Sequence, residues 1–317
     1  MTVLVISGDS DPTVNRVVLE LRDRAVPVFR CDVGWFPTGL SLDAVLDEGR
    51  WRGSLTTPHR SVDLDAIRSV LFRSPTGFTF DAGVSAAELR HMRMEARLGL
   101  GGVLASLPVP WCNHPARQAD AGYKPWQLTV AAQCGFSVPT TMITNDPKAV
   151  HRFTTDFPQV VNKVLGVNRM DDGPVTRIAY TRLLESADLA DLTGVETTAH
   201  LFQEWVEKSF EVRLIAVGAT LFAVAIRAHS AAARIDWRSD YSNLSYSVID
   251  PPSDVVASVG RFLTAFGLMF AAFDFVVTPS GLWRFLEANP AGQFGWLEEA
   301  AGVPVSAAIA DMLAGTA

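Results

Sequence analysis

Three side chains with hard oxygen donors flank a short turn near the end of the sequence. Asp274 precedes the turn at residues 278–281, in which proline is second and glycine last, and Glu287 and Asn289 follow it. Such a turn between two apolar runs predicts a hairpin closed by a type I turn. Two carboxylates and an amide oxygen suit Mg²⁺, which uses few protein ligands and leaves positions for phosphate oxygens. The spacing therefore predicts a metal site at Asp274, Glu287 and Asn289.

The register of this hairpin determines which side chains share a face. If the turn closes symmetrically, Asp274 lies opposite Phe285, and strand alternation places Phe285, Glu287 and Asn289 on the face of Asp274. Asp274 and Glu287 are then diagonal neighbours about 7–8 Å apart, close enough to share one ion. An edge hairpin with its polar face in water is the alternative. The flanking Phe, Val, Leu and Trp residues favour burial instead, and buried carboxylates need a partner.

Cationic side chains precede the hairpin at positions that favour an anionic ligand. Lys163 lies in the middle of an otherwise largely apolar strand expected over 160–165, so it faces a groove or an anion. Lys124 lies in an expected helix and by itself indicates only a solvated charge. Between residues 208 and 238, five Lys or Arg residues stand against two acids in an otherwise acidic chain. This excess favours a polyphosphate ligand, although a solvated sheet edge explains it equally well.

Composition and charge restrict the class of protein. The chain has 317 residues, of which 48% are hydrophobic and 19% charged, as in soluble globular proteins with two or three lobes. Its net charge of −7 argues against nucleic-acid binding as the main function. The three cysteines lack the spacing of a metal site. No basic signal segment is apparent at the start of the sequence. The longest apolar run, residues 262–273, is too short for a membrane span. We expect a cytoplasmic protein with no membrane partner.

The elements that would position these side chains begin with an N-terminal α/β pattern. Strands are expected at residues 3–6, 27–31, 69–72 and 109–112, with helices at 12–24 and 85–104. This alternation predicts an open, largely parallel sheet. An inserted hairpin is expected from residues 42–46 and 51–56. Neither the dinucleotide fingerprint G-x-G-x-x-G nor the P-loop G-x-x-x-x-G-K-[ST] occurs, so a scaffold or recognition role is expected here.

The remaining two thirds of the chain carry the candidate site. A helix expected over 116–134 is followed by a strand at 136–143, a helix at 146–157 and the strand of Lys163. The polar loop at 166–173 is expected to close over a ligand. Strands at 201–206, 211–218 and 221–227 and a helix from 253 to 266 lead into the Asp274 hairpin.

The order of these candidates resembles the ATP-grasp superfamily over roughly residues 115–300. The matching residues are Lys124, Lys163, Gln203, Glu204, Trp205, Val206, Glu211, Arg213, Arg227, Asp274, Glu287 and Asn289. The resemblance implies an α/β pre-ATP-grasp domain at residues 1–115, followed by a two-lobed ATP-grasp fold, α+β in its C-terminal part. Residues 116–207 would form a central lobe with a linker helix and a small ATP-binding subdomain. Residues 208–317 would form the lobe with the Mg²⁺ site.

The resemblance also assigns contacts to the nucleotide. Lys124 and Lys163 would contact ATP phosphates, the second from a strand that borders the adenine pocket. Glu211 would hold the ribose. Adenine would receive its hydrogen bonds from a hinge segment made of Gln203, Glu204, Trp205 and Val206.

The chemical end of the site is implied in the same way. Arg213 and Arg227 would stabilise phosphates or an acyl phosphate, while Asp274, Glu287 and Asn289 would bind Mg²⁺. These roles agree with the hard oxygen ligands noted above.

Within the superfamily, the chain looks most like the ribosomal-peptide maturases that make graspetides, the microviridin-type cross-linked peptides, and most like their actinobacterial branch. The similar segments are 111–115 (W-C-N-H-P), 123–128 (Y-K-P-W-Q-L), 138–141 (V-P-T-T), 144–147 (T-N-D-P) and 287–290 (E-A-N-P). The resemblance implies ATP-dependent macrocyclisation of a precursor peptide that has a leader and a core. Asp or Glu side chains would become acyl phosphates, and Ser, Thr or Lys side chains would attack them. A homodimer is plausible for the family.

Asp236, Arg238 and His229 are further candidates, for orienting the acceptor carboxylate or assisting the hydroxyl. Arg238 is favoured over His229, and ordinary polar residues at strand ends are the alternative for all three.

Two other functions also stay open. A carboxylate–amine ligase that adds free amino acids to a protein or peptide would use the same ATP and Mg²⁺ residues. A non-catalytic peptide-binding relative would normally have lost its metal ligands.

Overall fold

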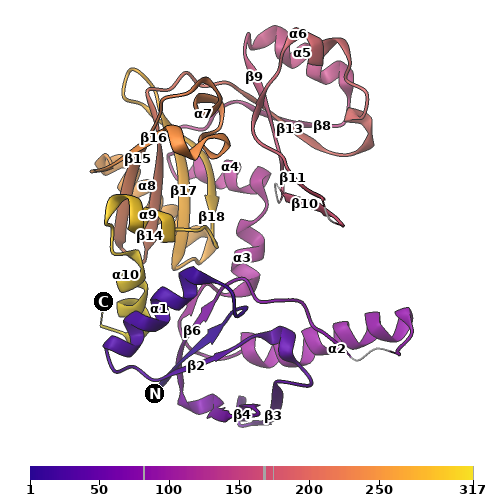
Figure 1. Cartoon of the computed structure of the whole chain (residues 1–317), viewed down its shortest axis with the longest axis vertical. Helices are drawn as coiled ribbons and strands as arrows, with labels where there is room; N and C mark the ends of the chain where they lie inside the picture. Colours follow the sequence, from indigo (N-terminus) through magenta and orange to yellow (C-terminus); the bar gives the residue numbers. More distant parts are fainter. Residues whose placement is uncertain (81–82, 167–168, 174, 317) are drawn as a thin grey trace.

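Four parallel strands form the N-terminal sheet, as the alternating pattern predicted. The computed structural model describes residues 1–80, 83–166, 169–173 and 175–316. The sheet has the order β2-β1-β6-β7, and its strands are β1 (Thr2–Ile6), β2 (Val28–Cys31), β6 (Ile67–Phe72) and β7 (Trp111–Cys112). Helices α1 (Pro12–Asp23) and α2 (Ala86–Ala105) accompany it (Figure 1). Asp11 caps α1 by accepting hydrogen bonds from the N–H groups of Thr13 and Val14.

The inserted hairpin is also confirmed. Strands β3 (Ser41–Asp47) and β4 (Arg50–Thr57) pair in antiparallel fashion, and β5 (Arg60–Asp63) extends them to three strands. Glu48 and Gly49 both have positive φ, as a two-residue type I′ turn requires. Short 3₁₀ turns at Val33–Trp35 and Leu64–Ala66 connect this insertion to the parallel sheet.

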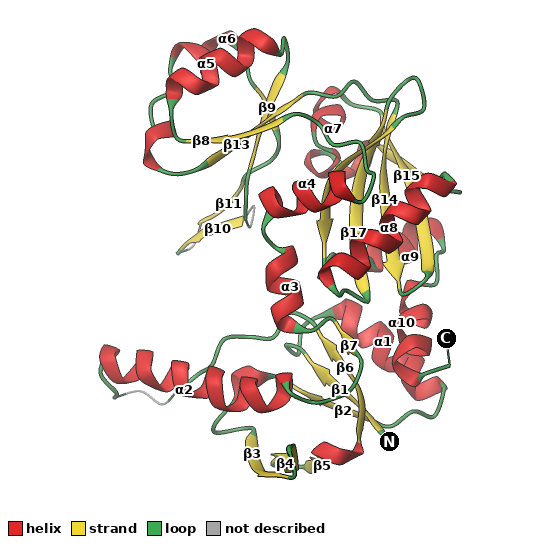
Figure 2. Cartoon of the chain, turned by 180° about the vertical axis from the view of Figure 1, so that it is seen from behind, coloured by secondary structure: helices red, strands yellow, loops and turns green. Residues whose placement is uncertain are grey.

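The single helix expected over residues 116–134 is wrong, because the chain forms two helices there. Helix α3 (Pro115–Ala121) ends at Gly122, and α4 (Lys124–Gln133) starts at Lys124. Pro125 is in the first turn of α4, where its missing N–H costs nothing. The break makes α3 the connection between the N-terminal sheet and α4 (Figure 2).

A small antiparallel sheet follows, with the order β12-β9-β13-β8. Its strands are β8 (Thr141–Thr144), β9 (Val160–Lys163), β12 (Arg182–Leu183) and β13 (His200–Glu204), and its helices are α5 (Pro147–Asp156), α6 (Ser186–Ala190) and the 3₁₀ turn Val195–Thr197. The loop expected over 166–173 is instead partly a hairpin, since β10 (Arg169–Asp172) pairs with β11 (Val175–Ile178). Residues 167 and 168 of the expected loop lie outside the described residues.

The largest sheet has five antiparallel strands in the order β16-β15-β14-β17-β18. They are β14 (Phe210–Val217), β15 (Thr220–Ala228), β16 (Leu244–Ile249), β17 (Phe270–Val277) and β18 (Trp283–Asn289). Helix α8 (Ser253–Phe266) packs its apolar stripe on one face, and Gly267 ends it in the left-handed conformation. The β15–β16 connection holds α7 (Ala231–Ile235) and 3₁₀ turns at Trp237–Ser239 and Tyr241–Asn243.

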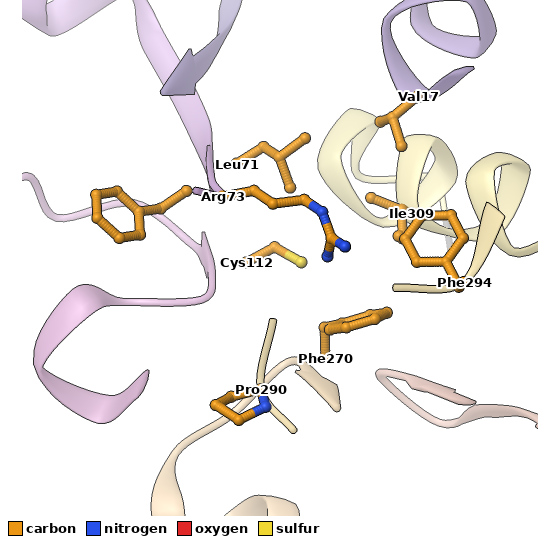
Figure 3. Close-up of a pocket in the computed structure, with 9 residues that line it drawn as sticks. Val17, Leu71, Arg73, Cys112, Phe270, Pro290, Phe294 and Ile309 are labelled. Atoms are coloured by element: carbon orange, nitrogen blue, oxygen red, sulfur yellow. The ribbon is translucent and has the colours of Figure 1, made fainter. Parts of the chain in front are cut away.

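The last two helices bring the C-terminus back to the N-terminal sheet (Figure 1). They are α9 (Gly295–Ala301) and α10 (Val305–Ala314), and α10 packs against α1. At this junction the Arg73 guanidinium is buried among Cys112, Phe270 and Phe294 (Figure 3), where it pairs with Asp11 at 3.4 Å. None of the described helices has the length and apolarity that a membrane span needs.

Candidate functional site

The turn that begins the site lies at the predicted residues, but the hairpin closes one residue later than expected. The N–H of Gly281 donates to the carbonyl of Thr278 at 2.9 Å, as in a hydrogen-bonded β-turn. Gly281 has a φ of 84°, which a residue with a Cβ rarely adopts. The hairpin consequently closes between Thr278 and Leu282, whose carbonyl accepts the Thr278 N–H at 3.0 Å.

A second irregularity sets the register of the carboxylates. Phe275 pairs with Phe285, whereas Asp274 pairs with Glu287, so Leu286 is an extra residue in the outer strand. The expected pairing of Asp274 with Phe285 is therefore wrong, and Phe285 lies in the core beneath α8. Asp274 and Glu287 are direct neighbours across the two strands, closer than the diagonal arrangement expected from the sequence.

The carboxylates lie at one end of a cavity of about 740 Å³ that extends from the large sheet to the small sheet. Volumes of this size are typical of pockets for nucleotides and other small molecules. The structure brings most of the predicted site residues together on its walls. They are Lys124, Lys163, Gln203, Glu204, Trp205, Val206, Glu211, Arg213, Asp236, Arg238, Asp274, Glu287 and Asn289.

The expectation for Arg227 is contradicted. Glu211 pairs with Ile226, so the next residue, Arg227, projects from the opposite face of the sheet. There the Arg227 guanidinium lies 4.9 Å from the centre of the Phe210 ring and donates to the Ser247 hydroxyl at 2.7 Å. His229 is exposed, contacts Ser245 and does not line the cavity. Neither side chain is placed to contact phosphate in the cavity.

One nitrogen of Arg238 bridges the two carboxylates. Arg238 Nη2 lies 2.7 Å from Asp274 Oδ2 and 3.5 Å from Glu287 Oε1. Arg213 Nε lies 3.1 Å from the other oxygen of Asp274, and Lys124 Nζ lies 2.9 Å from Glu287 Oε2. Three cationic side chains therefore converge on one pair of acids.

The acids respond differently to this environment. Burial raises the pKa of Asp274 even though Arg213 and Arg238 oppose the shift. Burial acts in the same direction on Glu287, but Lys124 and Arg238 outweigh it and hold the pKa of Glu287 below its usual value. Glu287 is thus the carboxylate held most firmly in its charged form.

These residues fit a divalent cation. The oxygens of Asp274 and Glu287 already surround one positive group, the Arg238 guanidinium, and both are hard donors. Asn289 lines the same wall, and its Oδ1 accepts the Ala291 N–H at 2.9 Å. Within the described part of the chain no three His, Cys, Asp or Glu residues form a metal cluster. The candidate ligands on this wall are two carboxylates and a neutral amide. Mg²⁺ commonly uses one or two carboxylates and completes its shell with water and phosphate.

On the small-sheet wall of the cavity, Lys163 and Gln203 are linked across strands β9 and β13. Lys163 Nζ donates to Gln203 Oε1 at 3.0 Å, and Gln203 Nε2 donates to the Thr141 hydroxyl at 2.9 Å. Burial lowers the pKa of Lys163 to about 8. Lys124 Nζ donates to the Val164 carbonyl at 2.9 Å, which places both lysines over the same stretch of the cavity.

Comparisons with known proteins agree with this arrangement. A family model described as the MvdD pre-ATP grasp domain matches residues 2–119. A RiPP-associated ATP-grasp ligase from Chryseobacterium gregarium, solved with ADP and a leader and core peptide, has a TM-score of 0.90 and 26% identity, with 100% of this chain and 97% of that chain covered. The chain has the fold of the RiPP-associated ATP-grasp ligases and is an ATP-grasp ligase.

Two further solved structures support the assignment. The macrocyclase MdnC from Microcystis aeruginosa MRC, bound with precursor peptide MdnA, has a TM-score of 0.85 and 28% identity, with 99% of this chain and 100% of MdnC covered. The macrocyclase MdnB from the same organism has a TM-score of 0.80 and 26% identity, with 98% of each chain covered. A sequence search of curated proteins found no match. The predicted resemblance to graspetide maturases is confirmed, whereas the actinobacterial branch stays a prediction.

Asp236 is placed in the ligase to orient Arg238. Its Oδ1 accepts the Arg238 backbone N–H at 3.1 Å, and Arg238 Nη1 lies 3.4 Å away. Its Oδ2 accepts the N–H of Thr181 at 3.0 Å. Since both oxygens are engaged, the geometry favours a positioning role over the direct catalytic role expected from the sequence.

Two cations of the ligase received no individual role from the sequence. Lys208 Nζ pairs with Glu211 Oε1 at 2.5 Å and lies 4.8 Å from the centre of the Trp205 ring. Arg284 pairs with Glu204 and donates to the Val138 carbonyl. The cationic excess between residues 208 and 238 included Lys208, but no sequence signal places Arg284 beside Glu204, because the two residues are 80 positions apart and meet only through the fold.

Proposed function

We propose that this ligase is an ATP-dependent macrocyclase of a ribosomally made precursor peptide. Its substrate would be a peptide with a leader and a core, in which Asp or Glu side chains are joined to Ser or Thr as esters or to Lys as amides. The observation that carries the proposal is the carboxylate pair Asp274–Glu287, bridged by Arg238 at one end of a nucleotide-sized cavity. Similar structures contain ADP with a leader and core peptide, or a precursor peptide.

The cations of the cavity would prepare the first step. A peptide carboxylate is a poor electrophile, so its oxygen would attack the γ-phosphorus of ATP, with ADP as the leaving group and an acyl phosphate as the product. Lys124 and Lys163, which line the cavity, would hold phosphate oxygens, and Arg213 and Arg238 would offset the charge that spreads over them. Asp274, Glu287 and Asn289 would hold Mg²⁺, which when bound would neutralise charge on the phosphates.

The second step would join two side chains of the same peptide. A hydroxyl or amine of the core would attack the acyl carbon, its proton would be lost and phosphate would leave. Because both groups belong to one bound peptide, holding them close makes the attack effectively intramolecular. Arg238, oriented by Asp236, is the cation best placed to hold the acceptor carboxylate.

The nucleotide contacts are proposed from the same cavity. Glu204, Trp205 and Val206 follow Gln203 along the wall and would contact adenine, while Glu211 would hold the ribose. The ion pair between Lys208 and Glu211 would have to open or shift for a ribose hydroxyl to reach the carboxylate. Arg284 would keep the Glu204 side chain turned away from adenine, toward the hairpin.

Intact-mass analysis tests the proposal against its main alternative. The ligase is incubated with a small peptide encoded beside its gene, ATP, Mg²⁺ and a mixture of free amino acids. We expect the peptide to lose one water mass per cross-link, and alkaline hydrolysis then separates esters from amides. A gain of amino-acid mass would establish a carboxylate–amine ligase instead. Absence of both ATP turnover and mass change would favour a non-catalytic peptide-binding protein.

A further inference from the structure

Helix α4 contacts the outer strand β18 through a buried glutamine. Gln127 is 3% exposed, and its Nε2 donates to the Ala288 carbonyl at 2.6 Å. The N–H of Ala288 donates back to Gln127 Oε1 at 3.0 Å. Because β18 is the last strand of its sheet, these backbone groups have no further strand to pair with. The Gln127 amide therefore substitutes for a neighbouring strand at one residue.

That residue lies between two of the proposed metal ligands. Ala288 separates Glu287 from Asn289, so fixing its backbone fixes the starting point of both side chains. Lys124 is one helical turn before Gln127 on α4 and pairs with Glu287 at 2.9 Å. The same helix therefore holds Glu287 through its side chain and Ala288 through its backbone.

A second buried amide fixes the neighbouring ends of the two strands. Asn113 is 2% exposed, and its Nδ2 donates at 2.8 Å to the carbonyls of both Phe270 and Pro290. Its Oδ1 accepts the N–H groups of Met269 and Phe270 at 2.8 and 3.0 Å. Asn113 thus connects the start of β17 to the residue that follows Asn289.

We propose that Gln127 and Asn113 are positioning residues that hold the carboxylate pair in the geometry needed for a divalent cation. The inference rests on the proposed function. It assigns a role to two segments, residues 111–115 and 123–128, in which only Lys124 had one so far. Each amide uses both its donor and its acceptor on backbone groups, so a carboxylate of the same shape would face carbonyl oxygens instead. Residues that orient metal ligands commonly change metal affinity about 10- to 100-fold when they are replaced.

Isothermal titration of ADP at a series of Mg²⁺ concentrations tests the proposal without using peptide turnover. In Gln127→Met we expect the half-saturating Mg²⁺ concentration to rise about 10- to 100-fold, with little change in ADP affinity without metal. Gln133→Met, an exposed glutamine on the same helix, is the matched control and should behave as the wild type. Leu100→Ala, in the separate core beneath α2, controls for loss of stability alone.

Hydrogen exchange of residues 283–291 provides a second readout in the absence of nucleotide and metal. The segment should exchange faster in Gln127→Met than in Gln133→Met, because the Ala288 N–H loses its acceptor. If Gln127→Met does not fold, the same measurements are made on Asn113→Asp. An unchanged Mg²⁺ requirement, or an equal change in Leu100→Ala, would overturn the positioning role while leaving the ligase intact. ADP binding that never depends on Mg²⁺ in the wild type would overturn both proposals.

Discussion

Asp274 and Glu287 lie directly opposite one another on strands β17 and β18, and Arg238 Nη2 lies within 3.5 Å of an oxygen of each. A guanidinium between two carboxylates occupies the place where a divalent cation would have its protein ligands. Arg238 therefore has two proposed partners, the carboxylate pair and the acceptor side chain of the peptide. Movement of the Arg238 guanidinium from the carboxylate pair to the acceptor side chain would couple metal binding to peptide binding.

Replacing Arg238 by lysine is expected to lower kcat/KM for the peptide by about 10- to 100-fold. Lysine keeps the charge, but a single ammonium cannot present the planar fork that contacts Asp236, Asp274 and Glu287 together. Arg234→Lys, an exposed arginine in α7, is the control and should retain full activity. Equal rates for wild type and Arg238→Lys would show that only the charge at this position matters.

The two arginines predicted from the sequence to stabilise phosphate should behave differently. Arg213 contacts Asp274 inside the cavity, so Arg213→Met is expected to lower kcat/KM by about 100-fold or more. Arg227 lies on the other face of the sheet, so Arg227→Met should change activity by less than about threefold. Steady-state ATP turnover with peptide present measures both. A large loss in Arg227→Met would contradict the assigned strand faces.

Nucleotide affinity should depend on pH through Lys163. Because burial lowers its pKa to about 8, the free ligase carries a charged Lys163 below that pH and a neutral one above it. We expect ADP affinity to be constant below about pH 8 and to fall by up to about tenfold per pH unit above it. Calorimetric titration from pH 6.5 to 9.5 measures this. Lys163→Arg stays charged and should show a flatter profile, whereas an identical decline in that variant would assign the dependence to another group.

The ion pair at the junction of the N-terminal sheet and the C-terminal helices should contribute to stability. Arg73→Met leaves the buried Asp11 carboxylate without its cation, and removing one partner of a buried pair costs about 3–5 kcal/mol in the free energy of unfolding. Urea unfolding followed by circular dichroism measures the change. Asp11→Asn in the same background should recover part of the loss, because the uncompensated charge is then removed. A loss below about 1 kcal/mol would mean that the cluster around Arg73 holds the junction without the ion pair.

The sequence predicted elements whose signal is local, and it was less successful where a tertiary contact sets the geometry. Alternating strand and helix patterns placed the parallel sheet, and the proline and glycine at 278–281 placed the turn. The later closure of that turn pairs Phe285 with Phe275 and puts Phe285 in the core. The extra residue at Leu286 then moves Glu287 opposite Asp274, and it leaves no mark in the sequence because Phe285 and Leu286 are both apolar.

The same contrast between local sequence signals and tertiary contacts applies to the site residues. Most of them line one cavity, as the resemblance implied. Arg227 does not, because the Glu211–Ile226 pair sets its face and this register across β14 and β15 has no local signal in the sequence. The division of the chain at residues 115 and 207, the homodimer and the cytoplasmic location stay predictions.

The proposed function depends most directly on the carboxylate pair, which would support condensation within one peptide. Intact-mass analysis of the peptide encoded beside the gene, after incubation with ATP and Mg²⁺, compares wild type, Glu287→Gln and the exposed control Glu95→Gln. We expect loss of water with the wild type and Glu95→Gln, and an unmodified peptide with Glu287→Gln. Full dehydration by Glu287→Gln would contradict the proposed role of the carboxylate pair.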